Sequence, residues 1–537
     1  MKQRFIPPPA PPPPPPTPIT RDTWLASISA FAGAWMVIMS TRHFSLQASD
    51  VNGALGVGVD SGSWLSTAYA VCEPIGVVIG AWLGMILSLR RMLLGGVVLF
   101  LLGMGLPLIA PSYETMMASR VLTGLAAGAI MPQCIVIQLQ AWGPARSPVA
   151  IALYLSAATA GLPLGGVVGA WGVERFGWTF ILWASMPLGL LALVTGAIGC
   201  RRDRYSWAPL AHADVGGFVS LCASLGLLAC ALNQGDRMRW FQTPMIPILL
   251  LASAACLAVF VLREWRAIRH PALWVKLYGR WNITLAAILV LALTFAISLS
   301  GVIIPSVLTQ IQGFRPEQIA PALWAVAWPQ ALSYALCVII IRRRLCEVRL
   351  MVILGFSAVA IGALVNLRLT SQWQVGELYL GQVIQGLGLP LIAVPLIYQF
   401  TGDLRPPAEA LPAASAFNIS RVLGGAIATA WANTSLRLNA QAKFTELLSN
   451  TGFYPAGRGD TLAVLTARLS HTTADPVLAR AQAVQLVAGA ARRQAAVLGA
   501  TGTLSTLAWI LFGSCILVVL MAEFGWGKAL RPHEKRP

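Results

Sequence analysis

One carboxylate lies deep inside the long apolar stretches of this sequence. It is Glu73, in the run Tyr69-Ala-Val-Cys-Glu73-Pro74, and it is the one acid deep in the first six apolar segments. An ionised acid in a bilayer costs on the order of 3 kcal/mol, so we expect Glu73 to be protonated, paired or facing water. Such a group can bind and release a proton when its surroundings change. Alternatively, Glu73 belongs to a buried pair with a purely structural role.

Basic and polar side chains in other apolar segments are further candidates for proton handling. Arg120 and Arg42 are candidate partners for Glu73, and His43, next to Arg42, can titrate near physiological pH. Arg421 follows Asn418 by one helical turn in the second half of the chain. An arginine inside a membrane span is by default a functional-site hypothesis. Alternatively, Arg120 braces two helices and His43 is a satisfied residue at a helix end.

Glycines recur at helical spacing in the same apolar segments. Spacing by four residues places them on one face of a helix, where the lack of a side chain lets a second backbone approach closely. We therefore predict close helix crossings, and helices that can move against each other, at these positions. They are Gly124, Gly128, Gly161, Gly165, Gly169, Gly424 and Gly425, with Pro163 inside the middle set.

Other chemistries find no support in the sequence. The nine cysteines lie in or at the ends of apolar runs without CxxC or Cys/His spacing, so we interpret them as small core residues and expect no metal site. No Walker, Gly-rich phosphate or Ser/His/Asp pattern is present, so we expect no cofactor and no catalytic residues. The formal charge of +18 does not indicate nucleic-acid binding, because Lys and Arg fall in short clusters between apolar runs.

The elements that must position these residues are membrane-spanning helices. Hydrophobic residues make up 57% of the 537 positions and charged residues only 11%, which predicts an all-α polytopic membrane protein. About fourteen apolar segments have the length of roughly 20 residues that a bilayer requires. The segments are Trp24–Leu46, Trp64–Leu87, Met92–Ala110, Thr115–Ala141, Val149–Trp171, Trp178–Ile198, Val215–Asn233, Thr243–Leu262, Ile283–Leu308, Ile319–Ile341, Leu350–Leu367, Leu378–Gly402, Leu411–Asn433 and Leu504–Met521.

Loop charges orient these segments. By the positive-inside rule, basic clusters on one alternate set of loops place both chain ends in the cytoplasm, and this requires an even number of spans. The clusters are Arg90/Arg91, Arg146, Arg201/Arg202/Arg204, Arg263 to Arg280, Arg342/Arg343/Arg344, Arg405 and Lys528 to Arg536. The long loop from Thr434 to about Gly499 on the opposite side is also basic, but long loops cross largely regardless of charge. Asp475-Pro476 within it predicts a helix start that leads into the last span.

The expected domain organisation follows from these segments. Residues 1–23 form a Pro-rich cytoplasmic tail, either solvated or a docking ligand, without an evident cleavable signal. A six-helix bundle over 24–200 precedes two extra helices over 201–270. A second six-helix bundle over 271–523 contains the 434–499 loop, and 524–537 form a basic cytoplasmic tail.

From Trp24 to Met521 the chain resembles the major facilitator superfamily, and within it the fourteen-span drug:proton antiporters of EmrB/QacA type. No single motif is specific, but the order and spacing of several together are. The matching residues are Trp64 with Tyr69; Arg120-Val-Leu-Thr-Gly124 with Gly128 and Met131-Pro132; Gly161-Leu-Pro-Leu-Gly165 with Gly169 and Trp171; Trp178, Phe180, Pro187 and Gly189; Pro305, Gln310 and Gly313; and Asn418-Ile-Ser-Arg421-Val-Leu-Gly424-Gly425.

The sequence also departs from the family pattern. The family's first span usually carries an aspartate, whereas the corresponding region here reads Met39-Ser-Thr-Arg42-His43 and has no acid. The loop after the second span keeps the basic pair Arg90 and Arg91 but lacks the family's acid. The proline of the fifth-span motif has moved to Pro163. These departures put the coupling mechanism in question more than the fold, and they leave Glu73 as the candidate coupling acid.

The resemblance implies two pseudo-symmetric six-helix bundles plus two extra helices, with Arg120 at a central cavity. It implies proton-driven export of amphipathic organic compounds across the inner membrane, using the proton gradient and no cofactor. It also implies a periplasmic adaptor and an outer-membrane channel as partners, which the 434–499 loop could contact. An importer or symporter of a small organic solute remains an alternative, because fold does not fix direction. A third hypothesis is a non-transporting sensor or a membrane enzyme.

Overall fold

The computed structural model describes residues 18–202, 214–266, 281–370, 373–402, 409–450, 460–471 and 475–523. The described residues are helical and contain no strand. The sequence expectations for most of the Pro-rich tail and for the basic tail lie outside these residues.

The first group of helices forms one bundle of spans. Thr20 begins α1 with a capping box, because its hydroxyl accepts from the Thr23 amide while the Thr23 hydroxyl accepts from the Thr20 amide. The elements are α1 (Arg21–Leu46), the short α2 (Ala48–Ala54), α3 (Val59–Leu87), α4 (Leu89–Ile109), α5 (Tyr113–Trp142), a fifth span made of α6 (Ser147–Leu155), a π-helical turn (Ser156–Ala160) and α7 (Gly161–Phe176), and a sixth made of α8 (Phe180–Trp183) and α9 (Met186–Gly199).

Two further helices, α10 (Val215–Gly235) and α11 (Met245–Arg266), follow the first bundle as an antiparallel pair. They are joined near the middle of both helices, where Ser224 and Ser253 each donate to the other's backbone carbonyl at 3.0 and 2.8 Å. At one end Arg263 donates to both carboxylate oxygens of Asp214, which holds the pKa of that carboxyl below its usual range. α10 packs on α3, so the pair lies against the first bundle.

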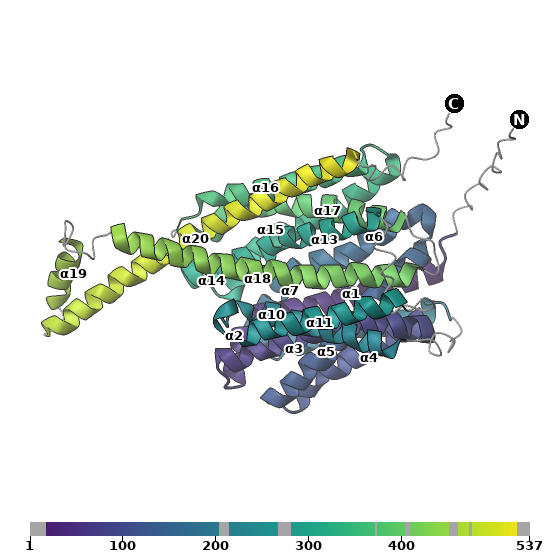
Figure 1. The fold of residues 1–537 in the computed structure, drawn as a ribbon, viewed down its shortest axis with the longest axis horizontal. Coiled ribbons are helices and arrows are strands. Elements are labelled where there is room, and N and C mark those ends of the chain that lie inside the picture. Colours follow the sequence, from purple (N-terminus) through teal and green to yellow (C-terminus); the bar gives the residue numbers. More distant parts are fainter. Residues whose placement is uncertain are drawn as a thin grey trace, which may run out of the picture.

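The second bundle holds the remaining helices. They are α13 (Trp281–Ser298), which continues through a π-helical turn (Leu299–Ile303) into α14 (Ile304–Gln312); α15 (Pro316–Arg343); α16 (Val348–Val365); α17 (Tyr379–Gly402); α18 (Ala410–Asn450); α19 (Asp460–Ser470); and α20 (Pro476–Glu523). Figure 1 shows α16 and α20 along one edge of the molecule, α3 and α4 along the opposite edge, and α18, α7 and α1 between them.

Thirteen helices of the described residues are long and apolar enough to cross a membrane. The fourteenth expected segment, Leu411–Asn433, lies inside α18, which is not among the thirteen. Its membrane-length part carries Ser415, Asn418 and Arg421, and these lower its mean hydropathy although they are buried or half-buried between the bundles. α18 nevertheless runs alongside the other spans (Figure 1).

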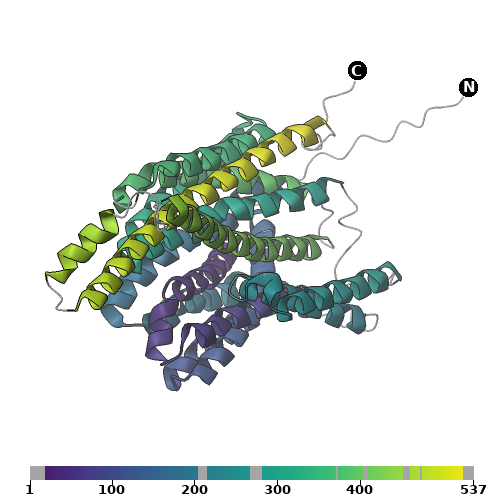
Figure 2. The ribbon, with the colours of Figure 1, turned by 60° about the vertical axis from the view of Figure 1, so that its left-hand side comes forward.

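The expected loop over 434–499 is largely helical where it is described. α18 continues to Asn450, and α20 begins at Pro476, one residue after Asp475, whose carboxylate accepts from the Val477 amide at 2.8 Å. The predicted helix start at Asp475-Pro476 is therefore confirmed. The extended ends of α18 and α20, with α19, project beyond the other helices (Figures 1 and 2). We call this part the hairpin, its side of the bundle the hairpin side, and the opposite side, where α1 begins and α20 ends, the chain-end side.

Candidate functional site

A chain of polar contacts crosses from the first bundle to the second at the middle of the spans. Arg421 Nη2 lies 3.4 Å from Glu73 Oε1 and forms an ion pair with it. Arg421 Nε donates to Asn418 Oδ1 at 3.4 Å, and the Tyr154 hydroxyl donates to the same oxygen at 3.0 Å. We call these four residues the Glu73 network. It joins α3 and α6 of the first bundle to α18 of the second.

The Glu73 network is largely shielded from solvent. The side chains of Glu73 and Arg421 are only 14% and 19% exposed, and Asn418 and Tyr154 are fully buried. Two opposite charges at this depth stabilise each other, whereas either one alone would be an uncompensated charge in a low-dielectric site. Of the three expected states of Glu73, which are protonated, paired or facing water, the structure shows the paired one.

Arg120 lies next to this network without a carboxylate in direct contact. Its guanidinium carbon is 4.1 Å from the ring centre of Phe44 and 4.5 Å from that of Tyr69. Aromatic faces stabilise a desolvated arginine by cation–π attraction. Arg120 also interacts electrostatically with Glu73. Tyr69 is held in turn by Thr41, whose hydroxyl donates to the Tyr69 oxygen at 2.8 Å.

Arg42 lies elsewhere and contacts the second bundle directly. Its Nη1 donates to the Gly301 carbonyl at 2.6 Å and its Nη2 to the Ser300 carbonyl at 3.5 Å, both in the π-helical turn of that bundle. The expectation that Arg42 pairs with Glu73 is therefore wrong for this structure, because backbone carbonyls of the π turn take its hydrogen bonds. Such turns break the regular α-helical ladder and occur often at functional sites.

The π-helical turn of the first bundle also forms hydrogen bonds with the second bundle. Thr159, in that turn, accepts from Gln330 Nε2 at 2.8 Å and shares a hydrogen bond with the Tyr334 hydroxyl, both from α15. Each bundle therefore presents its π turn to a polar side chain of the other bundle. A cavity of about 10 Å³ lies among these residues, which is room for about one water molecule.

The predicted glycine faces form close helix crossings at most positions. In the fifth span the three glycines spaced by four lie against one face of α1, and in α5 two glycines lie against α3. The pairs are Gly161 with Trp35, Gly165 with Met39 and Arg42, Gly169 with His43, Gly124 with Tyr69 and Cys72, and Gly128 with Glu73 and Val77. Pro163 lies beside this crossing and lines the small cavity at Arg42.

The two glycines of α18 differ from each other. Gly424 lies against Thr294 and Leu291 of α13, whereas a Cβ at Gly425 would have no atom within 4 Å. The expectation of close packing therefore holds for Gly424 and is wrong for Gly425. Gly425 faces away from the neighbouring helices, because consecutive helix positions point in directions about 100° apart.

His43 and the basic pair Arg90 and Arg91 are not part of the Glu73 network. His43 is fully buried against Gly169 of α7, with its ring centre 6.2 Å from that of Phe180. Arg90 donates to the carbonyls of Gly196 and Ala197 at 3.4 and 2.6 Å and so caps the C-terminal end of α9, where positive charge is favoured. Arg91 follows it in the first turn of α4. The contacts of His43 and Arg90 therefore lie within the first bundle.

A second inter-bundle connection lies on the hairpin side, at the end of α10. Residues 234–240, which we call the α10 clasp, contact α3 of the first bundle and α18 of the second. Gln234 donates to Thr67 at 2.6 Å, Arg237 pairs with Asp60, Asp236 pairs with Arg437 at 2.9 Å, and Trp240 Nε1 donates to Thr434 at 2.8 Å. The inserted helix pair thus connects the two bundles as well as covering one face of the first.

Sequence reasoning missed several members of this site. Tyr154, Thr159 and Gln330 resemble ordinary polar residues of a span, and Ser300 and Gly301 act through backbone carbonyls that sequence does not distinguish. For Tyr154, the signal was a polar aromatic residue inside an apolar segment near the fifth-span glycines. Among the described residues there is no group of His, Cys, Asp and Glu that could hold a metal, and all nine cysteines are free thiols.

Fold and site together define the class. The chain is an all-helical polytopic membrane protein built from two bundles that meet at a buried ion pair. A family model described as the Major Facilitator Superfamily matches residues 23–429, which is more than half of the chain. The chain belongs to the Major Facilitator Superfamily.

Individual relatives agree with this assignment. The multidrug export protein EmrB of Haemophilus influenzae is 26% identical over 421 residues, which cover 75% of this chain and 79% of the relative. The fatty acid resistance protein FarB of Neisseria gonorrhoeae is 22% identical over 455 residues, covering 82% and 86%. The solved proton:xylose symporter XylE shares the fold with a TM-score of 0.57 at 12% identity, covering 95% of this chain and 97% of that one. These relatives are transport proteins rather than enzymes.

Proposed function

We propose that this protein exports amphipathic organic compounds, drugs among them, from the cell by proton-coupled alternating access in the inner membrane. Relatives named as multidrug export proteins support the substrate class. The observation that carries the mechanism is the Glu73–Arg421 ion pair, since it joins the two halves that must move against each other. The driving force is the proton gradient, and no cofactor is required.

Protonation of Glu73 is the expected coupling step. The ionised carboxylate attracts Arg421 and keeps α3 and α18 together. When Glu73 takes up a proton the attraction is lost, and the desolvated guanidinium of Arg421 is then more stable facing water or a substrate. Separation of α3 and α18 would open the site to one side of the membrane. Arg120, close to Glu73 but held by aromatic rings, favours return of the carboxylate to its charged form.

Charge distribution supports an orientation with both chain ends in the cytoplasm. Short basic clusters flank the spans on the chain-end side, among them Arg90 with Arg91, Arg146, and Arg342 to Arg344. The hairpin then lies in the periplasm. There it is the part of the chain that an adaptor protein, leading to an outer-membrane channel, would meet.

The experiment is transport into inverted membrane vesicles that contain the protein. Under an imposed proton gradient, the wild type should accumulate one or more members of a panel of amphipathic dyes and drugs, and a protonophore should abolish the accumulation. Glu73→Gln should reduce it to the level of empty vesicles, because the amide cannot exchange a proton. Glu174→Gln, which neutralises an exposed acid at the end of α7, is the matched control and should transport normally.

The same assay separates export from the alternative of an importer or symporter of a small organic solute. XylE, which shares the fold, is a symporter by name, and this observation keeps the alternative open. Gradient-driven uptake into right-side-out vesicles, with none into inverted ones, would establish import. Full accumulation by Glu73→Gln would remove Glu73 from the coupling mechanism, whichever direction is found.

A further inference from the structure

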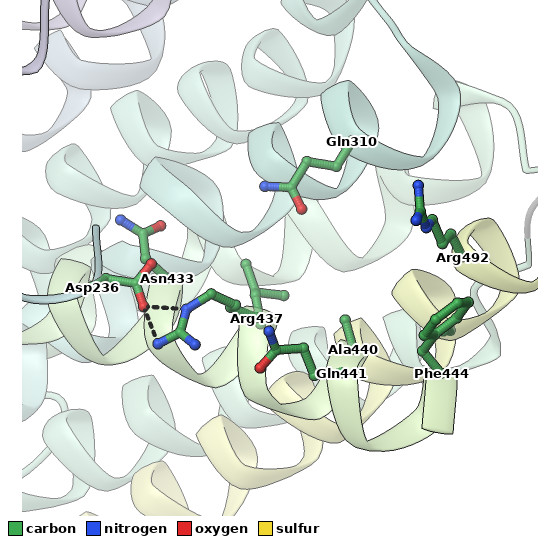
Figure 3. Close-up of a pocket in the computed structure, with 10 residues that line it drawn as sticks. Asp236, Gln310, Asn433, Arg437, Ala440, Gln441, Phe444 and Arg492 are labelled. Carbon is green, nitrogen blue, oxygen red and sulfur yellow. Dashed lines mark hydrogen bonds and ion pairs between the residues drawn. The ribbon is translucent and has the colours of Figure 1, made fainter. Parts of the chain in front are cut away.

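A cavity separate from the Glu73 network lies on the hairpin side, between α10, α14, α18 and α20 (Figure 3). Its volume is about 480 Å³, within the range of roughly 300–1,000 Å³ that small-molecule sites occupy. Its lining combines cationic, amide and apolar groups. The residues are Asp236, Gln310, Asn433, Leu436, Arg437, Ala440, Gln441, Phe444, Arg492 and Ala495.

The charges of this cavity favour an anion. Arg437 donates from Nε to Asp236 Oδ1 at 2.9 Å, and its Nη2 lies at the same distance from that oxygen, so these two charges balance. Arg492 enters no ion pair among the described residues, and its guanidinium carbon lies 5.8 Å from the ring centre of Phe444. Figure 3 shows Arg492 and Phe444 together at the end of the cavity away from the Asp236–Arg437 pair. The lining therefore has a net positive charge centred on Arg492.

The lining also has an apolar part. Leu436 and Ala495 are buried, and the ring of Phe444 is half-buried beside Arg492. The amides of Gln310 and Gln441 supply hydrogen-bond donors between the two arginines (Figure 3). A guanidinium with several N–H donors binds a carboxylate or phosphate in two-pronged geometry, and an aromatic ring beside it accommodates an apolar body.

The position of the cavity fits a molecule that moves between membrane and water. Gln310 belongs to the last turn of α14, where that span ends, whereas Phe444 and Arg492 lie on the extended parts of α18 and α20. The cavity thus reaches from the edge of the membrane spans to the base of the hairpin. An amphipathic ligand can place its head group at the arginines while its apolar part stays near the spans.

We propose that this cavity is a second binding site, outside the central one, for amphipathic organic anions with a carboxylate or phosphate head group. Arg492 is the principal head-group ligand, with Gln310 and Gln441 as donors and Phe444 as the apolar contact. Arg437 is paired with Asp236 and binds the anion only when the anion displaces that carboxylate. The inference depends neither on the direction of transport nor on Glu73.

The test measures binding of radiolabelled dodecanoate to the full-length protein in nanodiscs of phosphatidylcholine, with empty nanodiscs subtracted. We expect a saturable component of one dodecanoate per chain that depends on Arg492, and no Arg492-dependent binding of dodecyltrimethylammonium, a cation of equal chain length. Arg492→Gln should weaken dodecanoate binding about tenfold, as loss of a charged hydrogen bond does. Arg480→Gln removes the same charge from an exposed position farther out on α20 and should bind as the wild type does.

Two further arms complete the test. Phe444→Ala should weaken dodecanoate more than octanoate, because the longer chain covers more of the ring. Nanodiscs containing phosphatidylglycerol distinguish a lipid head group from a free amphiphile: if the lipid is an occupant, it competes with dodecanoate in the wild type and not in Arg492→Gln. The proposal is overturned if dodecanoate binding has no saturable component, if Arg492→Gln weakens binding of the cation as much as binding of dodecanoate, or if Arg480→Gln and Arg492→Gln weaken dodecanoate binding equally in protein of unchanged thermal stability.

Discussion

Glu73 and Arg421 are 348 positions apart in the sequence and lie 3.4 Å apart in the fold. Because both side chains are largely shielded, each charge stabilises the other between the bundles. Removing one partner should therefore cost more than removing both. This difference separates a working ion pair from two independent polar residues.

A double-mutant cycle tests this coupling. Glu73→Gln and Arg421→Gln should each lower the stability of the folded protein by about 3 kcal/mol, since each leaves one buried charge without its partner. The double variant should lose clearly less than the sum of the two. The measurement is thermal unfolding in nanodiscs, with Glu174→Gln as a neutral control. Additive losses would mean that the two charges do not interact in the membrane-embedded protein.

At the scale of single residues, the sequence predicted which charged residues matter but not which residues they contact. Glu73, Arg120 and Arg421 could be singled out because a charge inside an apolar segment is costly wherever it lies. Their partners depend on which helices pack together, and one sequence does not contain that information. Arg42 was one of two candidate partners for Glu73, on charge alone, whereas in the structure it donates to the carbonyls of Ser300 and Gly301.

At the scale of the helices, the spans could be predicted and their irregularities could not. Segment boundaries from hydrophobicity lie close to those of most helices, because bilayer thickness fixes the length of an apolar run. The hairpin was expected to be a loop, apart from the helix start at Asp475-Pro476, because the stretch from Thr434 to Gly499 carries too many charged and polar residues to count as a membrane span. The π turns at Ser156–Ala160 and Leu299–Ile303 leave no recognised pattern in the sequence.

The crossing of α3 and α5 gives an element-scale prediction. A Cβ at Gly128 would overlap the carbonyl oxygen of Glu73, so Gly128→Ala should push the helices apart and destabilise the protein by about 1–3 kcal/mol. Gly425→Ala, in α18, has nothing within 4 Å and should be neutral or stabilising by about 0.5–1 kcal/mol, because alanine favours helix.

Thermal unfolding of both variants, together with the transport assay, checks this prediction. Gly128→Ala should also reduce transport, since the displaced carbonyl belongs to Glu73 itself. Equal stability of the two alanine variants would show that the helix crossing is looser than the structure has it.

At the scale of the whole molecule, the two bundles touch on both the chain-end side and the hairpin side. On the chain-end side Leu411 of α18 lies 3.0 Å from the position of a Cβ on Gly84 of α3. On the hairpin side Leu323 of α15 lies directly against Gly166 of α7, and the α10 clasp adds further contacts. The cavity at Arg42 between the two bundles has a volume of only about 10 Å³, which is room for about one water molecule and not for a drug-sized ligand. The proposed export by alternating access requires that one of these two contacts open at a time.

Paired cysteines at the two contacts test that requirement. In a background lacking the nine native cysteines, Gly84→Cys with Leu411→Cys should cross-link the chain-end side, and Gly166→Cys with Leu323→Cys the hairpin side. Alternating access predicts opposite responses, because one rigid-body tilt separates one contact as it closes the other. Conditions that raise cross-linking of one pair, such as a change of pH or added substrate, should therefore lower that of the other, and Glu73→Gln should abolish the pH response of both. If cross-linking instead rises or falls together at both contacts, the bundles separate along their whole length. The Glu73–Arg421 ion pair would then only hold the two bundles together and would not take part in alternating access.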